Sequence, residues 1–124
     1  MAAGTLSAAE WEDHGIVEHR TVELDGITVD ELKVKGEVDM RFMLSHLPDG
    51  TCHCPHWGIV HKGGFTVDYG DRTETVKAGD VFNMTPGHVP TYEIGTELTQ
   101  FSPTDELKAT DESIRKALEA LQQA

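Results

Sequence analysis

The ten residues from 79 to 88 read Gly79-Asp80-Val81-Phe82-Asn83-Met84-Thr85-Pro86-Gly87-His88. Gly-Asp and Pro-Gly are turn signals, and the run between them is short enough for a single strand. The stretch therefore predicts a strand over 81–84, held between two turns and followed closely by a histidine.

The same pattern continues on both sides of this stretch. Short runs rich in β-branched residues alternate with turn residues, and Asp25-Gly26 is a strong signal for a type I′ hairpin. The predicted strands cover residues 16–24, 27–34, 38–47, 56–62, 65–69, 72–76, 81–84, 91–94 and 98–101. Strands this short and this regularly spaced predict an all-β fold, an antiparallel sandwich or barrel.

Helices are predicted only at the two ends of the chain. Residues 7–10 read Ser-Ala-Ala-Glu, which is the spacing of a capping box, so a short helix is expected over 7–14. Near the other end, Ile114, Leu118 and Leu121 recur at i, i+4 and i+7. This periodicity predicts a helix with one apolar stripe that covers the β-body or packs against a partner.

These elements fit one domain over residues 1–124. The expected organisation is a helical arm over 1–15, a β-barrel over 16–103 and a C-terminal helix over 104–124. A chain of 124 residues and 13.6 kDa is long enough to bury a single core.

The charge balance excludes two classes of partner. Twenty-two acidic residues against ten basic ones give a net charge of −12, which repels nucleic acid and anionic membrane surfaces. No apolar run approaches the ~18 residues of a membrane span, and the first residues lack the pattern of a secretory signal. A cytoplasmic protein is therefore expected.

Cysteine and histidine gather in one short segment. The two cysteines are Cys52 and Cys54, and four of the seven histidines lie within residues 46–61. A disulfide between these cysteines would be strained and would close almost no loop. They are therefore expected to be free thiols in a reducing compartment, or metal ligands.

Strand periodicity divides this segment into two faces. Cys52, Cys54 and His56 share one face of an extended strand, while His53 and His61 share the other. His61 stays a candidate ligand because a bulge near the following double glycine could reverse its direction.

Residues 50–63 and 79–90 resemble the two motifs of the cupin superfamily. The first motif has Gly, two spaced His, a Glu and a closing Gly, and the second has Gly-Asp, Pro, Gly and a third His. Counting back from Gly63, His56 takes the Glu position and Cys52 one of the His positions. Counting forward from Gly50, His56 takes the first His position. The chain looks most like cupins that read Cys, then Pro-His, then Pro-Gly-His.

The resemblance implies an antiparallel cupin or jelly-roll barrel that binds one divalent metal ion. With Cys52 or Cys54, His56 and His88 as its ligands, one thiolate and two imidazoles suit tetrahedral zinc, and a fourth position left for water would make the site catalytic. Iron, nickel or manganese would be expected with three His and one Glu, but no Glu lies between Asp49 and Tyr69. It also implies a homodimer, for which the 16–34 hairpin is a candidate edge.

Two classes of function fit this resemblance. The first is a metal-dependent enzyme for a small oxygen-containing organic substrate, of the isomerase, cyclase, lyase or dioxygenase type. Tyr92 is its candidate general base, because no acidic residue is clearly directed inward. The second is a non-catalytic module that binds or senses a small molecule in the same pocket.

Overall fold

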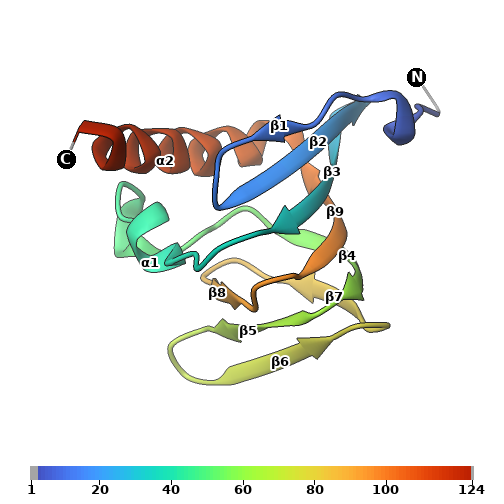
Figure 1. The fold of residues 1–124 in the computed structure, drawn as a ribbon. Helices are drawn as coiled ribbons and strands as arrows, with labels where there is room; N and C mark the ends of the chain where they lie inside the picture. Colours follow the sequence, from blue (N-terminus) through green and yellow to red (C-terminus); the bar gives the residue numbers. More distant parts are fainter. Residues whose placement is uncertain (1–2, 124) are drawn as a thin grey trace.

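The computed structural model describes residues 3–123, and within them two antiparallel sheets form the walls of a barrel (Figure 1). The larger sheet has the order β1-β2-β3-β9-β4-β7 and the smaller one the order β6-β5-β8. The strands are β1 Glu12–Asp13, β2 Val17–Leu24, β3 Ile27–Val34, β4 His56–Lys62, β5 Gly64–Asp68, β6 Thr73–Lys77, β7 Val81–Met84, β8 Val89–Tyr92 and β9 Glu97–Pro103. The helices are the 3₁₀ turns η1 Leu6–Ala8 and η2 Pro48–Gly50, and the α-helices α1 Met40–Met43 and α2 Thr104–Gln123. The expected antiparallel jelly-roll barrel with a C-terminal helix is confirmed.

The tight turn between β2 and β3 forms where the sequence predicts it. Asp25 and Gly26 have φ angles of 47° and 88°, so both central residues are in the left-handed region that a type I′ turn needs. Leu24 then pairs with Ile27, and the register continues to Val17 opposite Val34. The turn chemistry therefore sets the register of the two longest strands.

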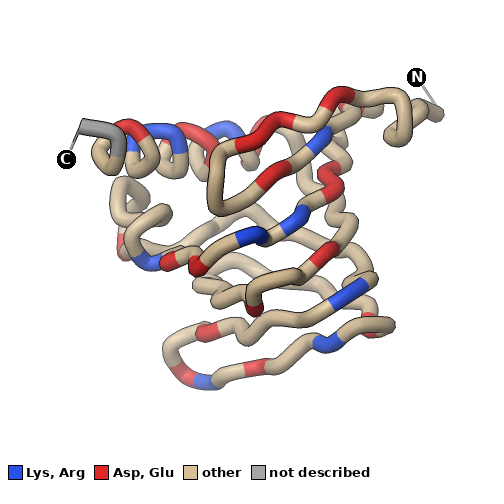
Figure 2. Tube along the Cα trace, in the orientation of Figure 1, with Lys and Arg blue, Asp and Glu red and all other residues tan. Residues whose placement is uncertain are grey.

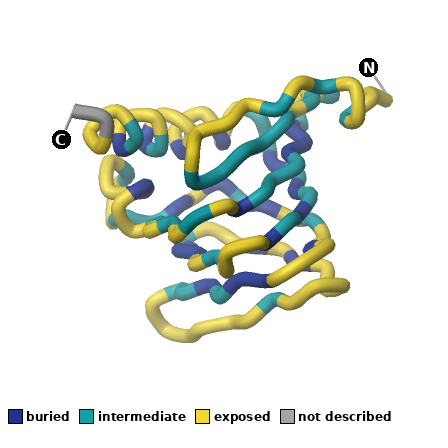
Figure 3. Tube along the Cα trace, viewed as in Figure 1, coloured by how far each residue is buried: buried dark blue, intermediate teal, exposed yellow. Residues whose placement is uncertain are grey.

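Buried side chains form two groups in the barrel, and Figure 3 marks the buried positions along the chain. The cluster between β4, β5, β7 and β9 consists of Val60, Phe65, Val67, Phe82, Met84 and Leu98. The cluster beneath α1 and α2 consists of Leu44, Cys52, Cys54, Val89 and Leu107. The first is built from alternate positions of neighbouring strands, whereas the second joins a strand to loops and helices.

Helix α2 lies along one end of the barrel (Figure 1), but its buried face is not the predicted stripe. The residues buried on it are Leu107, Thr110, Ser113 and Ala117. Leu121 is 52% exposed, while Ile114 and Leu118 are half-buried. The small side chains allow close approach of the helix, and apolar periodicity does not reveal them.

The predicted N-terminal helix over 7–14 is wrong beyond its first turn. Only η1 forms, and the chain then enters β1, where Glu12 pairs with His19 of β2. The ring of Trp11 lies under two cations, Arg20 at 4.6 Å and Lys33 at 4.4 Å. These contacts and the ladder with β2 favour an extended chain over a short, exposed helix.

The predicted strand over 38–47 is also wrong. The Asp39 carboxylate accepts hydrogen bonds from the backbone N–H groups of Arg41 and Phe42, which starts helix α1. Met43 and Leu44 are adjacent and both buried. Side chains of successive strand residues point to opposite faces, so a helical turn suits this pair better.

The expected edge of the larger sheet is only partly free. β3 pairs with β9, and β1 pairs with the outer side of β2 only at Glu18 and His19, so within residues 3–123 the outer side of β2 beyond His19 has no strand partner. The homodimer stays a prediction, with the remaining part of this edge as its candidate interface.

Charge is spread over the fold, with acidic residues on strands and on α2 (Figure 2). Among the described residues, no helix combines the length and the apolar character needed to cross a membrane.

Candidate metal centre

The backbone itself brings Cys52 and His88 together. These residues form an isolated antiparallel bridge, in which the N–H of Cys52 donates to the carbonyl oxygen of His88 at 3.1 Å. Gly87, with φ 95°, turns the chain so that its own N–H donates to the carbonyl of Cys52 at 2.8 Å. The Pro-Gly-His sequence therefore works as a turn that places His88 beside the cysteine.

His56 completes the cluster from the first position of β4. It pairs with Met84, the last residue of β7, and the next few residues lead directly to His88. Its Nε2 lies 3.5 Å from the Cys52 Sγ, and the His56 and His88 rings meet edge to face at 5.1 Å between centroids. One ligand atom from each of the three residues lies within 4.8 Å of the others.

Both imidazole rings are held through their Nδ1 atoms. His88 Nδ1 donates to the Thr85 carbonyl oxygen at 2.6 Å, and His56 Nδ1 lies 2.6 Å from the hydroxyl of Ser102. With its proton on Nδ1, His88 carries a lone pair on Nε2. That Nε2 is buried and has no hydrogen-bond partner among the described residues. A buried nitrogen lone pair left free in this way is available to a ligand.

Burial keeps the three side chains uncharged. Desolvation, followed by the nearby His88 ring, lowers the pKa of His56 to about 3, and desolvation also lowers the pKa of His88. Burial raises the pKa of the Cys52 thiol. The hydroxyl of Thr110, 3.1 Å from the Cys52 Sγ, opposes this rise in part. Neutral imidazoles are the form that binds metal, whereas the thiol must lose its proton when it does so.

These donors fit a zinc ion. Zn–S and Zn–N bonds of about 2.3 and 2.0–2.1 Å at a tetrahedral angle place the two donor atoms about 3.6 Å apart. The Cys52 Sγ to His56 Nε2 distance of 3.5 Å agrees with this spacing. The hydrogen bonds to Thr85 and Ser102 are the kind of support that orients imidazole ligands.

Cys54 and His61, the other predicted ligands, lie outside this cluster. Strand β4 begins only at His56, so Cys54 lies on a bend, and burial raises its pKa to about 12. It packs beside Leu44 and Val89 as a small apolar residue. The pairing of β4 shifts register close to His61, yet this ring stays exposed and contacts Thr99 Oγ1 at 2.7 Å.

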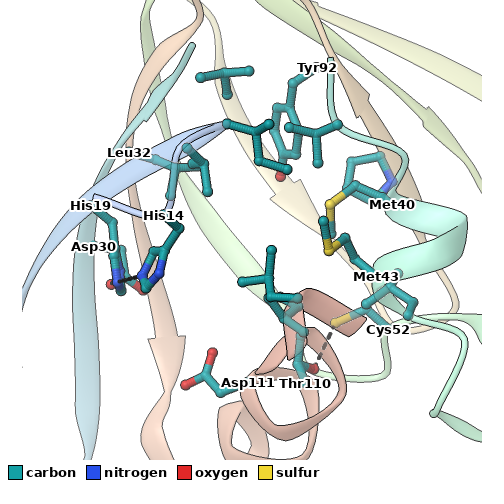
Figure 4. Close-up of a pocket in the computed structure, with 18 of the residues that line it drawn as sticks. His14, His19, Asp30, Leu32, Met40, Met43, Cys52, Tyr92, Thr110 and Asp111 are labelled. Atoms are coloured by element: carbon teal, nitrogen blue, oxygen red, sulfur yellow. Dashed lines mark hydrogen bonds and ion pairs between the residues drawn. The ribbon is translucent and has the colours of Figure 1, made fainter. Parts of the chain in front are cut away.

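The cluster lies in the wall of a pocket of about 530 Å³. Figure 4 shows Cys52, Met40 and Met43 on one side of this pocket and His14, His19 and Asp30 on the other. Tyr92 directs its hydroxyl into the space between them, and desolvation raises the pKa of that hydroxyl. Its position makes Tyr92 available as a proton donor.

The expectation that no acidic residue is directed inward is wrong. Asp30 of β3 and Asp111 of α2 both line the pocket (Figure 4). Partial desolvation, followed by the Asp30 carboxylate, raises the pKa of Asp111 to about 6. Asp30 shares one face of the predicted strand 27–34 with Leu32 and Val34, so strand periodicity could have identified it. Asp111 has no such local signal, because only the docking of α2 brings it to the pocket.

Comparison with known proteins supports the fold. No protein-family model matches the chain, and no curated relative was found. An RmlC-like cupin from Shewanella frigidimarina aligns with 81% of this chain and 88% of its own, at 18% identity and a TM-score of 0.55. The nucleoside dehydratase Pac13 of Streptomyces aligns over 81% and 79%, at 12% identity and a TM-score of 0.56. At such identities the likeness shows a common fold.

Proposed function

We propose that this chain, which has the cupin fold, binds one divalent metal ion through Cys52, His56 and His88, and uses it to catalyse proton transfer on a small oxygen-containing organic substrate. Zinc is the ion that this donor set favours. The observation that carries the proposal is the buried Nε2 of His88, which has no hydrogen-bond partner within residues 3–123 and converges with Cys52 and His56 on the wall of a pocket. The reaction type that these groups favour is an isomerisation, cyclisation or elimination.

The pocket supplies groups that hold and move protons. A bound zinc ion would polarise a substrate oxygen as a Lewis acid. Asp111, with a pKa of about 6, exchanges its proton near neutral pH and can act as acid or base. Tyr92 keeps its proton and can donate a hydrogen bond to an oxygen. Asp111 and Tyr92 line one pocket and could both take part in proton transfer there.

Two features set the substrate class. A pocket of about 530 Å³ falls within the range of about 300–1,000 Å³ in which small organic molecules bind. Apolar side chains, Met40 and Met43 among them, cover part of its wall. The structural neighbour Pac13 is described as a nucleoside dehydratase, and a dehydration is an elimination of the proposed type. The two buried thiols suit a reducing, cytoplasmic environment.

The metal site is tested first. Tag-free protein, stripped with a chelator and dialysed, should bind Co²⁺ with the near-ultraviolet absorption of a cobalt–thiolate bond. Cys52→Ser should lose this absorption, whereas Cys54→Ser should keep it. A band that survives in Cys52→Ser and disappears in Cys54→Ser would contradict the assignment of the thiolate.

Catalysis is tested by proton exchange. A panel of 1,3-diketones and hydroxyketones in D₂O, followed by NMR, should show enzyme-dependent deuterium uptake at a carbon next to a carbonyl. Asp111→Asn and Tyr92→Phe should slow the uptake by about 10²–10⁴-fold, the usual contribution of a general acid or base. Ligands that bind without any exchange would support the alternative, a non-catalytic binding or sensor module.

A further inference from the structure

A second group of metal-type ligands lies on the opposite wall of the same pocket. His14 Nε2 is 3.2 Å from His19 Nε2, and Glu12 Oε2 lies 3.0 Å from His19 Nε2 and 3.8 Å from His14 Nε2. All three residues line the pocket, and Figure 4 labels the two histidines there. Three donor atoms from three side chains thus converge on one point.

The three donor atoms of this group face one another, and few protons lie between them. His19 Nε2 faces both His14 Nε2 and the carboxylate oxygen of Glu12. A single N–H at His19 can point well at only one of these two acceptors. When the protons of His19 and His14 lie on their Nδ1 atoms, which for His19 is toward Asp30, all three facing atoms present lone pairs that a cation can bind.

The distances agree with tetrahedral coordination. Metal bonds of about 2.0–2.2 Å to nitrogen and oxygen place neighbouring donors about 3.3–3.5 Å apart. The three observed separations of 3.0, 3.2 and 3.8 Å lie around this value. Only small side-chain shifts would be needed to bind an ion.

His19 is also supported from behind. Its Nδ1 lies 3.5 Å from the carboxylate of Asp30, and that carboxylate accepts a hydrogen bond from the Thr21 hydroxyl at 2.5 Å. A carboxylate behind the second nitrogen of a histidine ligand orients the ring and strengthens it as a donor. The side chains of His14 and His19 are 38% and 30% exposed, so an ion can reach them from solvent.

We propose that Glu12, His14 and His19 form a second divalent-metal site, which takes a zinc-type transition metal through two imidazoles and one carboxylate. Three protein ligands leave one position open. The site joins the N-terminal arm to the sheet, because Glu12 and His14 belong to the arm and β1, whereas His19 lies in β2. A bound ion therefore fastens the arm along the side of the pocket.

Cobalt titration separates the two sites by their spectra. The inner site contains a thiolate and the outer one only nitrogen and oxygen, so only the inner site gives the cobalt–thiolate band. Wild-type protein should bind two equivalents of Co²⁺. His14→Ala should bind one and keep the band, while the matched control His61→Ala should keep both equivalents. A His14→Ala variant that binds as much Co²⁺ as wild type would overturn the proposal.

The outer site is also tested without the inner one. Cys52→Ser combined with His88→Ala should bind one equivalent with no thiolate band, and adding His19→Ala should remove it. If the inner site did not bind metal and the outer one did, wild type would bind one equivalent of Co²⁺ without the thiolate band. The two proposals can therefore be disproved independently. Should the combined variant not fold, the single variants above still decide the matter.

Hydrogen exchange gives a readout apart from stoichiometry. With Zn²⁺ at about 100 times Kd, opening of the metal-bound arm is suppressed about 100-fold. Backbone amides of residues 12–16 should slow accordingly in wild type and in His61→Ala, but not in His14→Ala. Equal exchange in wild type with and without Zn²⁺ would count against the site.

Discussion

The two ends of the barrel are filled differently. At one end Phe65, Phe82 and Leu98 pack into a closed apolar cluster, and the rings of Phe65 and Phe82 meet edge to face at 5.1 Å. At the other end α1, α2 and the N-terminal arm surround a pocket that includes His56 and His88. Close packing stabilises the fold at the first end. Incomplete packing at the second leaves room for a ligand among buried polar groups.

The largest expected effect is on stability at the packed end. Phe65→Ala removes a fully buried ring and should lower the free energy of unfolding by about 3–5 kcal/mol. Met40→Ala, at the pocket wall, should cost only about 1 kcal/mol, because Met40 is only partly buried there. Urea denaturation measures both variants. Equal losses would mean that the pocket end contributes to the core as much as the closed end.

The second largest effect on stability is expected at Gly58, which lies on β4 between the two ends of the barrel. Gly58 stands between His56 and Val60 on β4, and an added Cβ would lie 2.0 Å from the Thr99 carbonyl oxygen and 2.8 Å from the Gln100 Cα. These are backbone atoms of β9 and cannot move aside cheaply. Gly58→Ala should therefore cost about 3 kcal/mol in thermal or urea unfolding. Gly70→Ala, which has open space but a φ of 89°, is the control for backbone strain alone.

At the pocket end, the support of His56 should matter more for metal affinity than for stability. Ser102→Ala removes the hydroxyl beside His56 Nδ1 and should weaken metal binding by about 10- to 100-fold. Ser113→Ala is a matched control, because that buried serine bonds the Met43 carbonyl instead. Competition with a chromophoric chelator measures both. An equal loss of affinity in the two variants would indicate a general structural effect.

The smallest effect concerns the pH dependence of stability. The folded-state pKa of Asp111, about 6, lies above the ordinary value of 3.8 for an aspartate, so the native state holds more protons than the unfolded state between these two pH values. The contribution of Asp111 to stability should therefore fall as pH rises from about 4 to about 6. Asp30 and His19 act on this carboxyl from β3 and β2. Urea denaturation at several pH values measures this effect: between about pH 4 and about pH 6 the free energy of unfolding should fall less steeply in Asp111→Asn than in wild type. Equal slopes in the two proteins would contradict the prediction.

The strands that could be predicted are those whose signals are local. β3, β4 and β7 form over the predicted residues, and Asp25-Gly26 makes the predicted turn. The prediction failed at 38–47, where the capping carboxylate of Asp39 determined a helical turn that an apolar run does not reveal. It also failed at 7–14, where pairing with β2 outweighed the capping pattern.

For the site, the sequence identified the residues but not their grouping. Cys52, His56 and His88 are among the predicted ligands, but strand periodicity does not separate Cys52 from Cys54, and a possible bulge keeps His61 as a candidate. The structure separates them: Cys52 bridges to His88, β4 begins too late to align Cys54 with His56, and His61 stays exposed.

The sequence by itself determined the turns, most of the strands and the cysteine–histidine segment, because backbone preferences and strand periodicity act over a few residues. Only the tertiary structure decided what surrounds that segment. The Cys52 Sγ meets Thr110, 58 residues away, and the His56 ring meets Ser102, 46 residues away. Asp111 and the group around His14 reach the pocket in the same way, through the docking of a helix and an arm. Contacts at such separations depend on the packing of the whole chain, and no short pattern carries that information.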